Sequence, residues 1–232
     1  MDIGGTVLSD EIKRYGYWRV VIRPQRFEEA RIAEMSELLP ILMRCKLSVL
    51  GWDFPHISNT SRDIQRGTDF IGQDFRWNAI SEVMRFYQSG LFYHLSSIHL
   101  ETALVKWEDY VNFEKIHTVP IFIIGAIFHF IEIFELAARL SVTKAGDENM
   151  LIEVTLGNIK DRSLSYGNWP NMIMPGEYKS TISDYPQIVT IPRGELLDNP
   201  RALAAKMTKE LFSRFNWDIS VKLITDLQSN YH

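Results

Sequence analysis

The chain has 232 residues, of which 23% are charged and 46% are hydrophobic, as in an ordinary folded globular protein. Its net charge of -4 argues against a strongly basic nucleic-acid surface. The single cysteine, Cys45, excludes an internal disulfide and a cysteine-rich zinc site. Because the N-terminus also lacks the basic start and apolar run of a signal peptide, we expect a cytoplasmic protein.

No internal repeat or low-complexity linker divides the chain. We therefore expect residues 1–14 to form a flexible N-terminal tail and residues 15–232 to form a single α+β domain. Alternating apolar side chains in Tyr17–Arg23 predict the first strand. Residues 27–44 are predicted to be helical, with glutamates near the N-terminal end and Pro40 kinking or splitting the helix.

The next segments predict a sheet. Residues 46–57 form a second predicted strand and residues 68–77 a third, in which Gly72 suggests a bulge. The strongest β pattern covers residues 82–98, where two aromatic-rich runs flank a tight turn at Ser89-Gly90. Since neither face of this hairpin is purely polar, both faces should be covered in a layered structure.

A long apolar helix is predicted from Thr118 to Val142, with Thr118 as its cap and Pro120 in its first turn. Its charged residues arrive too early for a membrane span, which needs about 20 apolar residues. We expect a buried central helix with one polar stripe, at the edge of which Glu135 and Arg139 pair four residues apart. The stripe consists of Gly125, Phe128, Glu132, Glu135 and Arg139.

The rest of the chain predicts further strands and two closing helices. The helices begin at Asn199-Pro200, a cap followed by proline, and at about Ser220. We also expect a short helix at 101–111, a second strand pair at 150–156 and 162–166, a loop at 168–176 exposing Trp169, Met172 and Met174, and a last strand at 188–191. The expected architecture is a mainly antiparallel sheet with an aromatic hairpin, packed on the central helix and the C-terminal helices.

Familiar catalytic signatures are missing from the sequence. It has no phosphate-binding G-x-x-x-x-G-K-[ST] loop, no G-x-G-x-x-G, no G-x-S-x-G elbow and no H-E-x-x-H helix. Cys45 lies among Leu and Met and is interpreted as a core residue. The spacing of His129, Glu132 and Glu135 allows a shared metal, but no matching set occurs on another helix. We therefore assign no catalytic residue, no metal ligand and no cofactor.

The most unusual local string is GWDFPH, in which Asp53 and His56 lie three apart between large aromatics. These two residues, with Trp52, could form a ligand pocket or an acid–base pair. The alternative is that Trp52 and Phe54 are core residues while Asp53 and His56 form turn hydrogen bonds.

The hairpin carries Arg85, Tyr87, Tyr93 and His94. Sheet aromatics beside arginine are typical of single-strand nucleic-acid binders. Because the RNP pattern is missing and the net charge is negative, core or interface aromatics are the better explanation. Trp169, in the loop at 168–176, is a further candidate binding residue. The acidic residues on or near predicted strands form no D…E-x-K nuclease set; they are Asp53, Asp69, Asp74, Glu82 and Glu101.

Five strings, YWRVVIRP, GWDFPHI, RFYQSGLFYHL, IEIFELAARL and LFSRFNWD, resemble an uncharacterised bacterial domain. That domain occurs alone or beside Schlafen AlbA-like modules that bind ATP or nucleic acid. The resemblance covers residues 17–228 and implies a cytoplasmic accessory domain in a bacterial stress or anti-phage setting. It identifies no catalytic residue.

These observations favour a non-catalytic binding, sensor or regulatory subunit that acts through a protein partner or as a homo-oligomer. The first alternative is a metal-dependent hydrolase or nuclease that uses Asp53 and His56. The second is a nucleic-acid-binding module that uses Arg85, Tyr87 and Tyr93. We expect no association with a membrane.

Overall fold

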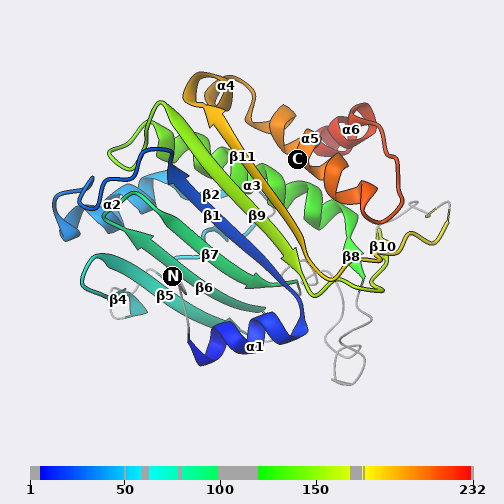
Figure 1. Cartoon of the computed structure of the whole chain (residues 1–232), viewed down its shortest axis with the longest axis horizontal. Helices are drawn as coiled ribbons and strands as arrows, with labels where there is room; N and C mark the ends of the chain where they lie inside the picture. Colours follow the sequence, from blue (N-terminus) through cyan, green and yellow to red (C-terminus); the bar gives the residue numbers. More distant parts are fainter. Residues whose placement is uncertain are drawn as a thin grey trace.

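A seven-stranded antiparallel sheet forms the frame of the protein, in the order β11-β9-β1-β7-β6-β5-β4. The computed structural model describes residues 6–49, 51–58, 63–77, 80–98, 120–167, 174 and 176–230. Helix α3 lies behind the sheet as seen in Figure 1, and α1 crosses the lower end of the strands. The fold is α+β, as predicted.

The elements have the following bounds. The strands of the large sheet are β1 (Tyr17–Pro24), β4 (Gln65–Arg66), β5 (Phe70–Trp77), β6 (Ile80–Tyr87), β7 (Phe92–Ser97), β9 (Asn149–Gly157) and β11 (Tyr185–Pro192). Two small sheets pair β2 (Leu47–Ser48) with β3 (Asp53–Phe54), and β8 (Ile121–Phe122) with β10 (Leu164–Ser165). The helices are α1 (Val7–Tyr15), α2 (Met35–Cys45), α3 (Ile123–Ser141), α4 (Arg193–Asp198), α5 (Pro200–Ser213) and α6 (Val221–Asn230).

The aromatic hairpin is confirmed as β6 and β7, which pair from Glu82 opposite Ser96 to Phe86 opposite Phe92. Because side chains alternate along a strand, each strand contributes to two layers. Side chains on one face of the hairpin, such as Phe86, join the main core beside α3. Side chains on the other face, such as Tyr93, join a smaller apolar cluster beside α1. Both faces of the hairpin are therefore covered, as predicted.

Helix α3 is buried on nearly all sides, between the sheet and α2, α4, α5 and α6. It begins at Ile123 rather than Thr118, because the preceding residues Ile121 and Phe122 pair with β10. Among the described residues, no helix is long and apolar enough to cross a membrane.

The polar stripe of α3 differs from the prediction. Glu135 pairs with Arg201 of α5 at 3.0 Å instead of with Arg139. The Arg139 guanidinium donates to the carbonyl oxygen of Lys46, at the end of α2, at 2.6 Å. Glu132 is only 7% exposed, so this part of the stripe faces the interior rather than solvent. Residues far apart in the sequence form these contacts, so the spacing of residues along α3 could not predict them.

The expected flexible tail is wrong from Val7 onward, where α1 begins. Thr6 caps this helix through its Oγ1, which accepts from the Ser9 backbone N–H at 3.2 Å. Ile12 of α1 is 2% exposed and packs on the outer cluster of the sheet. Burial of this apolar side chain fixes a helix that its short length alone would leave marginal.

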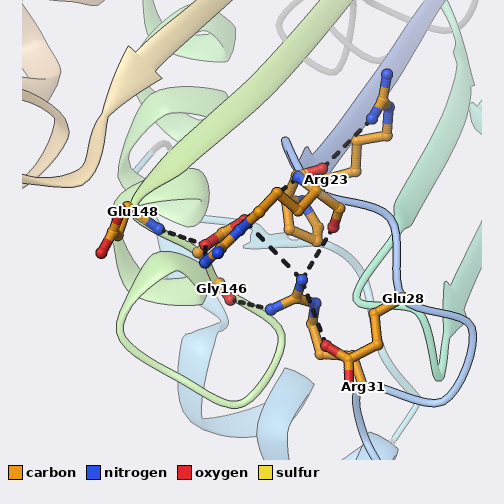
Figure 2. Close-up of polar contacts among 8 residues, drawn as sticks. Arg23, Glu28, Arg31, Gly146 and Glu148 are labelled. Carbon is orange, nitrogen blue, oxygen red and sulfur yellow. Dashed lines mark hydrogen bonds and ion pairs between the residues drawn. The ribbon is translucent and has the colours of Figure 1, made fainter.

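The second helix begins at Met35, so the predicted helical start at residue 27 is wrong. Pro40 lies inside the helix without ending it. The chain between β1 and α2 is instead a loop held by Asp147, which precedes β9. Figure 2 shows Arg31 of this loop beside Gly146, the residue before Asp147. Arg26 donates to the Asp147 carboxylate from its backbone N–H, its Nε at 3.0 Å and its Nη2 at 2.5 Å. Arg31 donates to the Gly146 carbonyl oxygen at 3.0 Å, so two loops far apart in sequence are tied together.

Three strand predictions need correction. Residues 46–57 form the two short strands β2 and β3, because the chain reverses at Gly51, which has a φ of 83°. Residues 162–166 do not pair with β9; their strand β10 runs parallel to β8. Gly72 causes no bulge, since β5 and β6 pair continuously past it.

The remaining strand and helix predictions agree with the structure at 150–156 and at the two C-terminal helices. The last strand, β11, is longer than predicted, running from Tyr185 to Pro192. The expected helix at 101–111 and most of the loop at 168–176, including Trp169, lie outside the described residues. Met174 is described and packs partly buried against the main core.

Candidate functional site: a buried histidine–glutamate cluster

The most unusual chemistry lies in the core between the sheet and α3. Glu82 of β6 and His94 and Ser96 of β7 point to the α3 side of the sheet, by the same alternation that places Phe92 in the main core. His129 and Glu132 of α3 complete the set. All five are buried, with exposed fractions between 0% and 7%. We call these five residues the polar cluster.

The cluster contains two histidine–carboxylate pairs. His94 Nε2 lies 3.2 Å from Glu82 Oε2, and His129 Nδ1 lies 3.2 Å from Glu132 Oε2. The hairpin register creates the first pair, since it sets Glu82 beside the strand position of His94. The i, i+3 spacing on α3 creates the second pair. The two imidazole rings are 6.4 Å apart between centroids, so the pairs are neighbours across the layer boundary.

Aromatic rings enclose the two histidines. Trp18 of β1 lies edge-on to His129 at 4.9 Å between centroids. Phe54 lies edge-on to both rings, at 5.1 Å from His94 and 5.3 Å from His129. The polar groups therefore sit in an apolar, water-poor setting, where electrostatic interactions are strong and unpaired polar atoms are costly.

Three atoms of the cluster have no hydrogen-bond partner among the described residues: His94 Nδ1, Ser96 Oγ and His129 Nε2. Only six such buried side-chain atoms occur among the described residues, so half of them gather here. Buried polar atoms in proteins are nearly always satisfied by protein, water or a ligand. The concentration of unsatisfied atoms at one place makes the polar cluster the candidate functional site.

Residues 51–58, which we call the covering loop, close over the cluster. Phe54 points inward to the two histidines, whereas Trp52 is 37% exposed. His56 lies over Phe75 of β5, with ring centroids 4.1 Å apart, and the Ser58 backbone N–H donates to Gln73 Oε1 at 2.9 Å. The sequence string GWDFPH therefore packs, through Phe54, against His94 of the hairpin.

The predicted Asp53–His56 acid–base pair does not form in this arrangement. Asp53 forms an ion pair with Lys46 Nζ at 2.6 Å, and the His56 ring packs against the Phe75 ring. Within the described part of the chain, no three His, Cys, Asp or Glu side chains are placed to hold a metal ion together. The geometry therefore gives no support to hydrolysis through Asp53 and His56.

The other hairpin candidates lie on the opposite face of the sheet. Arg85 is 4% exposed, forms a 2.7 Å ion pair with Asp74 and lies over the Phe70 ring at 5.7 Å. The ion pair satisfies an Asp74 oxygen that has no hydrogen bond of ordinary geometry. Tyr93 is 3% exposed in the apolar cluster beside α1, and burial raises the pKa of Tyr87. Because Arg85 and Tyr93 are buried, these two side chains are not accessible for stacking on nucleic-acid bases.

Sequence reasoning singled out His94, and separately the spacing of His129 and Glu132, but it did not join them. Glu82 was noted only as one carboxylate among several, and Ser96 was missed. The hairpin register contained a usable signal, because the turn at Ser89-Gly90 places Glu82 opposite Ser96. The sequence contains no comparable signal that β7 packs against α3.

The fold and the site define an α+β protein with one broad antiparallel sheet and a buried polar cluster beneath a short covering loop. Comparison with known proteins adds no closer identification. No family model, no curated protein and no solved structure matches this chain.

Proposed function

We propose that the protein is a non-catalytic binding protein that senses a small ligand at the polar cluster and acts through a protein partner or as a homo-oligomer. The observation that carries the proposal is the gathering in one place of His94 Nδ1, Ser96 Oγ and His129 Nε2, three buried atoms without a partner in the part of the chain that the structure describes. A ligand that hydrogen-bonds or coordinates these atoms would stabilise the folded state, because each unsatisfied group costs about 1–3 kcal/mol.

The covering loop supplies a route from the cluster to the surface. Phe54 contacts both histidines, while Trp52, two residues away, is exposed. The loop is also tied to the end of α2 by the Lys46–Asp53 ion pair. A ligand that changes the positions of the histidine rings must displace Phe54, and Trp52 moves with it. An exposed tryptophan that responds to a buried ligand suits a partner-binding surface.

The biological setting belongs to the proposal as well. A bacterial, cytoplasmic role in defence against phage is supported by the resemblance of the five sequence strings and by nothing in the fold. The buried cluster is compatible with a regulatory subunit in such a system, because a sensor needs differential binding between two states rather than chemistry.

Native mass spectrometry of the tag-free protein, purified from cells without denaturation, tests the proposal. We expect a mass above that of the bare chain, which returns to the chain mass on denaturation. Replacement of the two cluster histidines in His94→Gln with His129→Gln should abolish the added mass, while His56→Gln, outside the cluster, should keep it. A bare-chain mass for the wild-type protein, or an added mass that survives the double replacement, would overturn the proposal.

A further inference from the structure

We infer that the free edge of strand β11 pairs with the same edge of a second copy of the chain, which specifies the homo-oligomer of the proposed function and rests on it. β11 is the outermost strand of the large sheet, with a described neighbour, β9, on one side only (Figure 1). The strand at the opposite edge, β4, has only two residues. Among the described strands, β11 therefore presents the long edge of the sheet.

The prolines of β11 lie among the backbone groups that face this edge. The backbone N–H of Arg193 donates at 2.8 Å to the residue that precedes β9. Because backbone groups alternate between the two sides of a strand, the odd-numbered residues bond to β9 and the even-numbered residues face outward. Pro186 and Pro192, which have no N–H, are both even-numbered. Between them, the outward donors are the N–H groups of Ile188 and Thr190.

The edge of β11 lacks the charged side chains that usually keep sheet edges apart. Residues 185–192, YPQIVTIP, contain no charged residue and are rich in the β-branched residues that favour strand pairing. Ile188 is 63% exposed, on the face of the sheet opposite α3, since Tyr185 and Ile191 point into the main core. Exposed apolar edges of this kind associate with other strands unless a charge, a bulge or another element protects them. The two prolines confine such pairing to the segment between them.

The pattern of the edge is symmetric about Val189. Pro186 and Pro192 lie equally far from Val189 along the strand. Ile188 and Thr190 also flank it equally, so a two-fold axis at Val189 matches the edge to itself. With Ile188 opposite Thr190 of the second copy, every N–H that the two edges present between their prolines meets a carbonyl oxygen. One pair of copies occupies both long edges and therefore closes as a dimer rather than growing into a fibre.

The charged residues at the two ends of β11 also fit antiparallel self-pairing. Asp184 precedes the strand, Arg193 follows it, and both are exposed. Antiparallel pairing brings Asp184 of each copy beside Arg193 of the other. At the end of α5, exposed Arg214 lies with its Cζ 5.1 Å from the Tyr185 ring centroid, at the end of the strand that meets exposed Glu195 of the other copy. Each end thus carries both signs of charge, and each charge meets its opposite, which favours a second copy over an unrelated strand.

Size-exclusion chromatography with light scattering, at concentrations from about 1 to 100 μM, tests the dimer. We expect the mass to rise with concentration toward twice the 27.0 kDa of the chain. Ile188→Pro should abolish the dimer and keep the fold, because the lost N–H faces away from β9. Ile188→Lys should weaken dimerisation at least about tenfold, since it sets two lysines near the two-fold axis. Leu223→Lys, at a position of α6 that is 44% exposed, is the matched control and should dimerise like the wild-type protein.

Hydrogen exchange of single backbone amides identifies the surface that pairs. In the dimer, the amides of Ile188 and Thr190 should exchange slowly, and they should become fast on dilution or in Ile188→Lys. A dimer in which both amides exchange as fast as in the monomer would overturn the edge pairing. A chain that stays monomeric at about 100 μM, or an Ile188→Lys variant that dimerises as well as the wild-type protein, would overturn it too.

Dimerisation and ligand binding are measured independently. A dimer without an added mass in the native spectrum would uphold the pairing of β11 and overturn ligand sensing at the polar cluster. An added mass on a monomeric chain would overturn the pairing and leave a sensor that acts through a different protein.

Discussion

Replacement of Asp147 by asparagine is the sharpest stability test of the fold. The Asp147 side chain is 4% exposed and accepts from Arg26 at three atoms and from the Glu148 backbone N–H at 2.8 Å. The Arg26 side chain itself is 74% exposed, so solvent screens its charge. The expected loss lies between the roughly 1 kcal/mol of a surface pair and the about 3–5 kcal/mol of a buried pair, and we take about 2 kcal/mol at pH 7. For a chain of this length that corresponds to a Tm lower by about 4–8 °C.

The pH dependence of that loss tests its cause. The hydrogen bonds from Arg26, first of all those of its side chain, hold the pKa of Asp147 well below its usual range. A lowered carboxyl pKa gives stability that is fully present above the unfolded pKa of about 3.9 and is lost as the pH falls toward the folded pKa. At pH 3 the folded carboxylate is still ionised while the unfolded one is mostly protonated. The advantage of the wild-type protein over Asp147→Asn should then be smaller by about 1 kcal/mol than at pH 7.

Urea unfolding of both proteins at several pH values between 3 and 7 measures this difference. Glu28→Gln is the matched control, because Glu28 belongs to the same loop but is 62% exposed and lies 3.6 Å from Arg31. It should change the free energy of unfolding by less than about 0.5 kcal/mol at every pH. If the stability difference between the wild-type protein and Asp147→Asn stays constant from pH 7 to pH 3, the ionised Arg26–Asp147 pair is not its cause, and packing is.

Three further variants test the packing around the sheet by thermal unfolding. Gly72→Ala should lower stability by about 1–3 kcal/mol, because a Cβ there would lie 2.4 Å from Arg85 Cδ, whereas Gly194→Ala enters open space and should cost nothing; equal Tm values for the two would contradict the close packing. Phe54→Ala should cost about 3–5 kcal/mol as a buried aromatic, and a loss below 1 kcal/mol would show that the covering loop is not packed on the core. Burial lowers the pKa of Arg162 to about 10, yet the guanidinium remains charged at neutral pH. Arg162→Met removes the donor to carbonyl oxygens at the end of α1 and after β9 and should lower stability by about 1–3 kcal/mol. A variant as stable as the wild-type protein would show that those hydrogen bonds contribute little.

Elements whose signal is local were predictable from the sequence. The alternation in β1, the tight turn between β6 and β7, and the proline at the first position of α5 are each decided by residues within a few positions. The buried character of α3 followed from its composition alone. These features depend on strand period, turn chemistry and hydrophobicity, which a single sequence contains.

Elements fixed by distant partners were not predictable. The segment at 27–34 has helical spacing, but the bonds from Arg26 and Arg31 to the chain at 146–147 hold it as a loop. Glu135 finds Arg201 on another helix rather than Arg139 one turn away. In the same way, the two halves of the polar cluster come from a hairpin that ends at Ser97 and a helix that begins only at Ile123. The sequence therefore indicates single residues of the candidate site, and only the fold shows that they lie together.

The polar cluster is difficult to explain as a stabilising feature. Two histidine–carboxylate pairs enclosed by Trp18 and Phe54 lose hydration on folding, and each imidazole still has a nitrogen without a partner among the described residues. Apolar residues of similar volume at such positions are often neutral or stabilising by about 1–4 kcal/mol. The main core around α3 is otherwise built of apolar residues, most of them Ile, Leu, Phe and Ala, so an apolar filling is compatible with its packing. A fold that keeps His94 and His129 there gives up stability, and the ligand that we propose for the polar cluster would restore it by binding the folded state.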